Sequence, residues 1–267
     1  MISTITALKT KLYVAKLADD RLSDCSHALM RQLFFPKDES QNRFFSFTRS
    51  SQETSLILEE SALADFPAFS LTIVRTSWRA LSVSLGSVGY TGTGIVSSLS
   101  ALLAKAGISL FYLSTSNTDF ILVPEGKIDQ AIAALKSSFT IYSEGDVELD
   151  DDEVSSSSSS ASSNEPLATL QQNFLEMQGT SEIFKLSSAT PPCTLLPDEL
   201  RLCHIAMENR DACTHAILKL MLFTPDRSHF WSISETEDEM SLLIPDKFVS
   251  YFPPDALNAS DIWRPIQ

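Results

Sequence analysis

The chain has 267 residues, and its 34 acidic against 20 basic side chains give a formal net charge of −14. This balance disfavours nucleic-acid binding, which depends on Lys and Arg side chains that neutralise phosphates. A hydrophobic content of 43% is sufficient for packed cores, while no apolar run of about 18 residues predicts a membrane span. The four cysteines lack the spacing of a disulfide framework, and residues 1–9 lack the build of a signal peptide, so we expect a cytoplasmic protein.

Residues 1–76 have the pattern of a first small α/β module. Apolar residues alternate in the segments that we assign to strands, and they recur at helical spacing after Asp19, a residue suited to begin a helix. The expected order is strand 12–17, helix 22–33, hairpin strands 44–47 and 55–58, short helix 61–66 and closing strand 70–74.

Residues 77–142 form a predicted second module with a glycine-rich turn. Residues 86–94 hold four glycines, half of the eight in the chain. Gly107 is suited to end the helix that follows the turn in a left-handed conformation. The expected elements are strand 79–85, helix 95–106, strands 108–114 and 119–123, helix 128–139 and strand 140–142. This order is the split βαβ of the ferredoxin-like βαββαβ plan, so the expected class is α+β with helices on one face of each sheet.

Residues 143–198 are predicted to be a disordered linker. Seven of the 34 acidic residues lie in Glu144–Glu153, and a serine tract follows them. Such a composition cannot bury enough apolar surface to offset the entropy of ordering. The segment suits a solvated spacer, and phosphorylation of its serines is the alternative.

Residues 199–267 repeat the first module. Residues 230–234 follow residues 44–48 at an offset of 186 and share their aromatic–polar pattern, and Trp263 follows Trp78 at an offset of 185. An offset held this closely indicates duplication. The glycine-bearing module follows Trp78, whereas residues 264–267 alone follow Trp263, so we expect a fragment or a shortened gene product that ends where a fourth module would start.

The run Leu113–Val123 reads LSTSNTDFILV. It resembles the "LST, two polar residues, TDFILV" strand turn of the CASTOR proteins, and the glycine turn before a helix resembles the ACT domain, an amino-acid-binding regulatory module. The CASTOR proteins are cytosolic arginine sensors that restrain an activator of the TOR kinase. The resemblance implies tandem ACT modules, the first and third packed side by side so that their sheets join. It also implies two partners, a free amino acid (arginine first) and a regulatory complex of the TOR pathway.

The glycine turn is the first candidate site. Glycines let the backbone approach a ligand, and a helix N-terminus favours a carboxylate, so we assign Gly92, Thr93, Gly94 and Ile95 to an amino-acid site. The spacing fits neither a P-loop nor a dinucleotide fingerprint, and a plain strand-to-helix connection is the alternative. The first and third modules contain no glycine, so we expect them to be structural.

The resemblance adds two further groups of residues. Ser109 and Leu110, expected to begin the next strand, would contact an arginine held against the fourth module, with Leu110 in place of a valine. Ser116, Asn117 and Asp119 would contact the regulatory partner. The family has an aromatic residue and a glutamine where Ser116 and Asn117 stand, and Asp119 alone is kept. Ordinary turn chemistry is the alternative for these three residues.

No cofactor, metal site or enzymatic activity is predicted. Cys203, His204, Cys213 and His215 fall on different faces of their predicted elements, and buried small side chains are the better interpretation. The sequence has no nucleophile elbow, metal motif or spaced carboxylate pair. A ligand-free interaction scaffold and a regulatory fragment of an amino-acid metabolic enzyme are the alternatives to a sensor. The bare edge of the second module would invite pairing with another copy of the chain.

Overall fold

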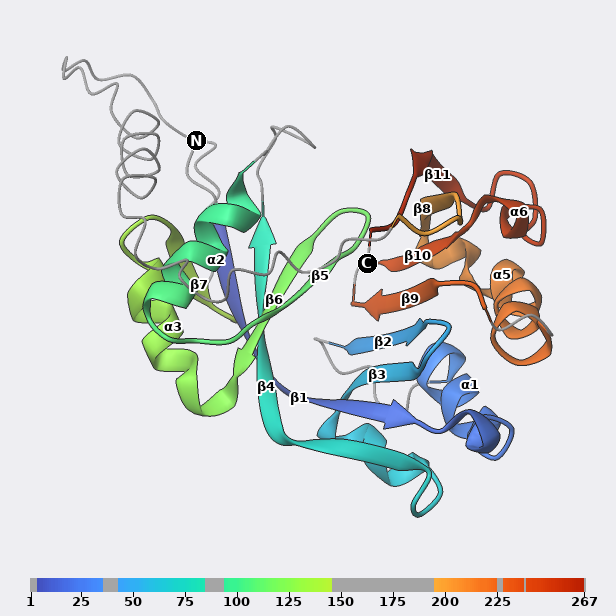
Figure 1. Cartoon of the computed structure of the whole chain (residues 1–267), viewed down its shortest axis with the longest axis horizontal. Helices are drawn as coiled ribbons and strands as arrows, with labels where there is room; N and C mark the ends of the chain where they lie inside the picture. The colour runs from blue at the N-terminus through green and yellow to red at the C-terminus, as the bar shows by residue number, and fades with distance from the viewer. Residues whose placement is uncertain are drawn as a thin grey trace.

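The computed structural model describes residues 4–35, 43–84, 94–145, 195–224, 228–237 and 239–266 (Figure 1). Its strands are β1 (Thr4–Leu17), β2 (Phe44–Arg49), β3 (Thr54–Glu59), β4 (Leu71–Ser84), β5 (Phe111–Ser114), β6 (Asp119–Pro124), β7 (Thr140–Ser143), β8 (Leu200–Ile205), β9 (Trp231–Thr236), β10 (Met240–Pro245) and β11 (Asn258–Trp263). Its α-helices are α1 (Ser26–Phe34), α2 (Ile95–Lys105), α3 (Ile128–Leu135), α5 (Arg210–Leu218) and α6 (Asp246–Val249).

The first and third modules share one strand order and are joined into one sheet. The first has the order β2-β3-β1-β4 and the third the order β9-β10-β8-β11, and β2 pairs with β9 between them. Phe47 lies opposite Ile233 in this antiparallel pair, and these residues are equivalent at the offset of 186. The two modules are therefore related by a local twofold axis between Phe47 and Ile233, which confirms the side-by-side packing that the resemblance implied.

All three modules contain the same four-residue hairpin turn. The amide of its first residue donates to the carbonyl of its fourth, at 2.9 Å in Ser50–Glu53, 2.9 Å in Thr115–Thr118 and 3.0 Å in Thr236–Glu239. A common turn fixes a common register, because strand register in a hairpin is set by turn type and length. Counting back three residues from each turn makes Tyr112 of β5 the equivalent of Phe47 and Ile233.

The longest strands, β1 and β4, run through two modules. They have 14 residues each and pair from Thr4 opposite Ser84 to Leu17 opposite Leu71, with a register shift between Ala7 and Lys11. The predicted strands 70–74 and 79–85 thus fall in one strand over residues 71–84, because no glycine or proline interrupts the segment between them, and residue 85 lies outside the described residues.

The second module borrows a strand from the N-terminus of the chain. Residues 4–7 of β1 pair in parallel with β7, which gives the strand order β7-β1-β4-β6-β5, five strands where the βαββαβ plan has four. The segments expected before and after residue 76 therefore share β1 and β4. Boundaries at residues 76, 142 and 198 stay a prediction, and the linker falls almost wholly outside the described residues.

Helices cover one face of each sheet, as predicted. In the second module α2 and α3 pack on Leu81, Val83, Ile121 and Val123, and Gly107 follows α2 with a φ of 68°. In the third module α5 begins at Arg210 without a side-chain cap. Within the described parts of the chain, no helix combines the length and apolar character that crossing a membrane requires.

The helix-free faces of the first and second modules pack against each other. Leu12 and Phe44 on one face contact Phe120 and Leu122 on the other, and the rings of Phe44 and Phe120 meet edge to face at 5.2 Å. Burying a large apolar side chain contributes about 1.5–3 kcal/mol, so this contact holds the bend between the two modules. Figure 1 shows the β5–β6 hairpin reaching from this contact towards the third module.

Removing the Phe120 ring tests this contact. Phe120 is 5% exposed, and Phe120→Ala is expected to lower the free energy of unfolding by about 3–5 kcal/mol through lost burial and a residual cavity. Phe69→Ala is the matched control, because Phe69 is 100% exposed and surface substitutions change stability by about 0.5 kcal/mol or less. Chemical denaturation measures both variants, and equal losses would contradict the packing argument.

Candidate functional site

The start of α2 is a helix N-terminus without a side-chain cap. Gly94 precedes the helix with a φ of 95°, a conformation that favours glycine, and the first turn has neither a side-chain cap nor an acidic residue. Backbone amides at such an end carry partial positive charge and attract carboxylates. Ile95 begins the helix and packs partly on the core of the module, whereas Gly92 and Thr93 lie outside the described residues.

Ser109 and Leu110 lie at the opposite end of the same helix. They precede β5, which begins at Phe111, so the expectation that they begin the strand is wrong. Ser109 is exposed, and Leu110 packs partly on the core of the second module. The 11 residues of α2 rise about 1.5 Å each, so the helix is about 16 Å long. One module therefore does not bring Gly94 and Ser109 together.

The pairing of β2 with β9 shows how two modules bring a helix start and a strand start together. Arg210 begins α5, Arg43 precedes β2, and both guanidinium groups contact the Glu235 carboxylate, at 3.1 Å and 2.8 Å. The helix start of one module thus meets the start of the edge strand of the other. Phe44 and Ser109 each precede their hairpin turn by six residues, so Ser109 is the second module's equivalent of Phe44, which follows Arg43 directly.

Ion pairs between side chains of the protein lie at both ends of the interface between the first and third modules. Glu235 is 0% exposed, and burial raises its pKa to about 7 against the opposing effect of Arg43 and Arg210. At the other end, Arg49 of β2 pairs with Asp19 at 3.3 Å. A carboxylate of the chain therefore occupies the position beside a helix start that a ligand carboxylate would take.

The equivalent edge of the second module is not paired. The sheet ends at β5, and no described strand lies on the outer side of β5. Phe111 is 43% exposed and Tyr112, the equivalent of Phe47 and Ile233, is 37% exposed. Burial and a hydrogen bond with Asp119 raise the pKa of the Tyr112 hydroxyl, so Asp119 is engaged within its own hairpin. This edge offers a pairing surface of the same kind as β2 and β9.

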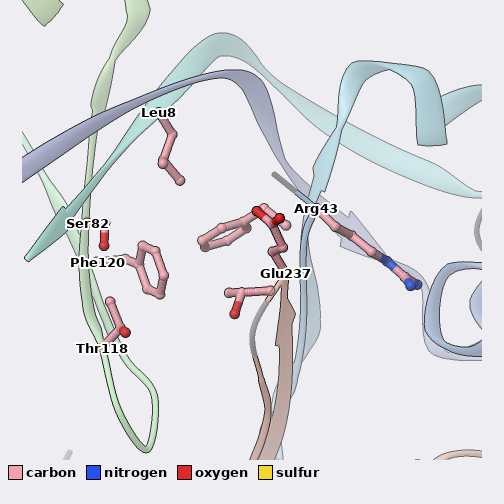
Figure 2. Close-up of a pocket in the computed structure, with 8 residues that line it drawn as sticks. Leu8, Arg43, Ser82, Thr118, Phe120 and Glu237 are labelled. Atoms are coloured by element: carbon pink, nitrogen blue, oxygen red, sulfur yellow. The ribbon is translucent and has the colours of Figure 1, made fainter. Parts of the chain in front are cut away.

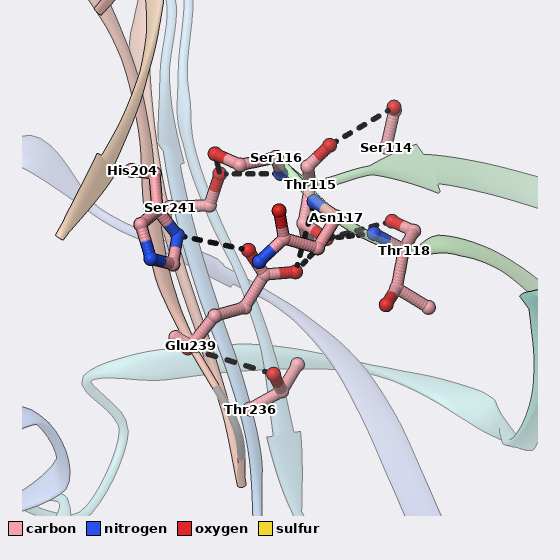
Figure 3. A network of polar contacts seen from close by, with 9 residues as sticks. All are labelled: Ser114, Thr115, Ser116, Asn117, Thr118, His204, Thr236, Glu239 and Ser241. Carbon is pink, nitrogen blue, oxygen red and sulfur yellow. Dashed lines mark hydrogen bonds and ion pairs between the residues drawn. The ribbon is translucent and has the colours of Figure 1, made fainter. Parts of the chain in front are cut away.

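The β5–β6 turn docks on the third module (Figure 3). The Ser116 amide donates to the Ser241 hydroxyl at 2.9 Å, and the hydroxyl groups of these two serines lie 2.8 Å apart. Thr115 Oγ1 donates to Glu239 Oε1, which also accepts the Asn117 amide at 3.3 Å. Thr115 and Ser116 are buried, whereas the Asn117 side chain is exposed. Ser116, one of the predicted partner contacts, is therefore buried within the molecule.

Glu239 is the residue that sequence reasoning missed at this contact. It is 2% exposed, and its second oxygen lies 3.4 Å from His204 Nδ1. Its equivalent at the offset of 186 is Glu53, which is exposed in the hairpin turn of the first module. Because the same residue type stands at both positions, no local signal distinguishes the buried carboxylate from the exposed one.

A small cavity lies where the three modules meet. It has a volume of about 90 Å³, and Figure 2 shows Ser82 and Phe120 on one side of it and Glu237 on the other, with the Arg43 side chain directed away. Ligand pockets for small molecules are typically about 300–1,000 Å³. This cavity is too small for an amino acid of arginine's size.

The cysteine and histidine residues of the third module lie on different faces. Cys203 and Cys213 are buried in the apolar core, and burial raises the pKa of the Cys203 thiol to about 11. His204 lies on the opposite sheet face beside Glu239, and His215 is exposed on α5. Among the described residues, no three His, Cys, Asp or Glu side chains are grouped as metal ligands.

Comparison with known proteins gives a family model and several relatives. The model, described as an ACT domain, matches residues 73–137. "Cytosolic arginine sensor for mTORC1 subunit 1" of Pongo abelii is 27% identical over 286 residues, 97% of this chain and 80% of the relative. The human protein of that name is 34% identical over 142 residues, so the match spans 51% of this chain and less than half (43%) of the relative. Human "Putative protein CASTOR3P" is 33% identical over 128 residues, 45% of this chain and 78% of the relative.

The buried Glu235 carboxylate predicts a pH-dependent stability. Its pKa is about 7 in the folded protein and about 4.5 when solvated, so between these values the folded state binds more protons than the unfolded state. We expect the free energy of unfolding to fall by about 3 kcal/mol, relative to Glu235→Gln, as pH rises across this window, and to change little above it. Denaturant titrations at several pH values measure the difference, and parallel curves for the two proteins would contradict it.

Removal of the Ser241 hydroxyl is expected to release the β5–β6 turn. Ser241→Ala leaves the Ser116 amide without its acceptor, a loss of about 1–3 kcal/mol for a buried donor, and should speed hydrogen exchange at Ser116. Ser234→Ala is the control, because Ser234 is also buried but pairs with Ser46 at 3.0 Å. Equal exchange at Ser116 in both variants would show that the Ser241 contact does not hold the turn.

Proposed function

Because the chain belongs to the CASTOR family of ACT-domain proteins, we propose that it is a non-enzymatic amino-acid sensor whose second module binds free arginine. The observation that carries this proposal is the unpaired edge of β5 beside Ser109, together with the uncapped start of α2 at Gly94. The first and third modules supply the comparison, because their equivalent edges are paired and closed by ion pairs.

The proposed site needs a second glycine-bearing module. If that module pairs with β5 as β9 pairs with β2, its helix start comes against Ser109 and Leu110, as Arg210 comes against the start of β2. Its own strand start then comes against Gly94 and Ile95 by the same twofold symmetry. The carboxylate of the ligand would accept from helix-start amides, in the position that the Glu235 carboxylate takes beside α5. A fourth module or another copy of the chain would complete this site.

Control of TOR signalling would follow from linkage. A ligand that binds between two modules stabilises the paired arrangement by its binding free energy, and it shifts the population of any conformation that a partner recognises. The names of the relatives motivate a cytosolic site of action and a regulatory complex of the TOR pathway as the partner. The exposed Asn117, at the tip of the docked turn, is the predicted partner contact that lies most open to such a complex.

A ligand-free interaction scaffold is the second candidate. The Arg43–Glu235–Arg210 cluster favours it, because side chains of the chain itself join the first and third modules at this interface. Under that reading a protein strand would cover β5, and the helix start at Gly94 would serve as a plain turn.

A panel of free amino acids separates the two candidates. Arginine at about 100 times its dissociation constant is expected to add about 2.7 kcal/mol to the free energy of unfolding, enough to raise the melting temperature by several degrees. Gly94→Val should abolish this shift, because a β-branched side chain at a φ of 95° distorts the helix start.

Gly126→Val is the matched control for this measurement. Gly126 precedes α3, has space around its Cα for a side chain and does not have a positive φ. It should keep the arginine response. Equal shifts for every amino acid, or no shift for any both in this chain and in a version extended by a fourth module, would favour the scaffold over the sensor.

A further inference from the structure

Three polar side chains around the third module, separate from the edge strand β5, form a linear series of hydrogen bonds. Asp198 precedes β8, His229 precedes β9, and Lys247 lies in α6. His229 Nδ1 lies 2.8 Å from Asp198 Oδ1, and Lys247 Nζ lies 2.5 Å from His229 Nε2. The fold thus places a carboxylate, an imidazole and an amine in the order of an orienting group, a base and a nucleophile.

The chemistry of the two outer groups assigns donor and acceptor roles to the His229 ring. An ionised carboxylate can only accept, so Nδ1 of His229 carries the hydrogen that it donates to Asp198. A lysine ammonium can only donate, so Nε2 of His229 accepts from Lys247 and its lone pair faces the lysine nitrogen. The His229 ring also packs edge to face on Phe248 at 5.7 Å, which restricts its rotation.

Among these three side chains, the amine is the most exposed to solvent, as a reactive amine requires. The side chains of His229 and Asp198 are 15% and 17% exposed, so the base and its orienting carboxylate are held in place. Lys247 is exposed, so an incoming group reaches its nitrogen from solvent.

We propose that Lys247 is an acyl-acceptor site that reacts with acyl thioesters, with His229 as its general base and Asp198 as the positioning residue. The Lys247 ammonium first loses one proton to solvent. The neutral amine then forms a C–N bond to the thioester carbonyl carbon, and the nitrogen loses its second proton to the neutral His229 Nε2. The C–S bond then breaks, and the leaving sulfur takes that proton from the imidazolium. The products are an amide and a thiol, and no oxidation or reduction occurs. Asp198 stabilises the transient imidazolium, as the carboxylate does in a Ser–His–Asp triad.

Acylation would change this corner of the third module. It removes the positive charge of Lys247 and converts a three-hydrogen donor into an amide, so the ammonium contact that joins α6 to His229 is lost. This site is independent of the proposed amino-acid site, because none of its residues lies in the second module.

Lys219 is the internal control for the proposal. It is exposed and belongs to the same module, but its ammonium lies 3.8 Å from the centre of the Tyr251 ring instead of against an imidazole. The intact chain is incubated with acetyl-CoA near neutral pH, and acetylation of each lysine is followed over time by peptide mass spectrometry. Since general bases typically accelerate reactions about 10²–10⁴-fold, we expect Lys247 to react at least about tenfold faster than Lys219.

Two variants test the roles of the base and the positioning residue. His229→Gln, whose side-chain amide can still donate to Asp198, should slow acetylation of Lys247 to the rate of Lys219 and leave Lys219 unchanged. Asp198→Asn should slow Lys247 less, and thermal unfolding confirms that each variant is folded. Equal rates for Lys247 and Lys219 in the unmodified sequence, or an unchanged Lys247 rate in His229→Gln, would overturn the proposal. Equal rates for the two lysines would be seen in the unmodified protein, without any variant.

Discussion

The pairing of β2 with β9 is the constraint on which the rest of the molecule depends. An unpaired edge strand exposes backbone donors and acceptors, and the first and third modules satisfy theirs by pairing equivalent strands around Phe47 and Ile233. This antiparallel pair turns two small cores into one continuous apolar layer beneath α1 and α5. It also places the helix start of one module at the strand start of the other, where Glu235 joins Arg43 to Arg210.

The second module is held by a different kind of contact. It is joined to the first through the shared strands β1 and β4, and its helix-free face packs on the helix-free face of the first module. This stacking directs the β5–β6 hairpin to the third module, where the turn is fixed by Glu239 and Ser241. Helices thereby cover one face of its sheet and the first module covers the other, while no described strand pairs with the outer edge of β5.

The contrast between the two kinds of edge is electrostatic. Where the first and third modules meet, charged side chains of the chain itself occupy the space at each helix start, and burial of Glu235 makes that closure sensitive to pH. The start of α2 has no side-chain cap and no acidic residue in its first turn, so among the described residues no carboxylate takes the position that Glu235 has beside α5. The proposal of a ligand site in the second module therefore rests on charge as well as on glycine content.

The sequence by itself determined the features that depend on neighbouring residues. Alternation and helical spacing located the strands and helices, Gly107 marked the end of α2, and the offset of 186 revealed the repeat. Tertiary structure alone decided that residues 71–84 form one strand, that β1 serves two modules, and that Gly94 and Ser109 lie at opposite ends of α2. It also decided that Glu239 is buried while its equivalent Glu53 is exposed. The physical reason is that burial and strand continuity depend on contacts between distant segments, such as Ser116 with Ser241, which local residue patterns do not encode.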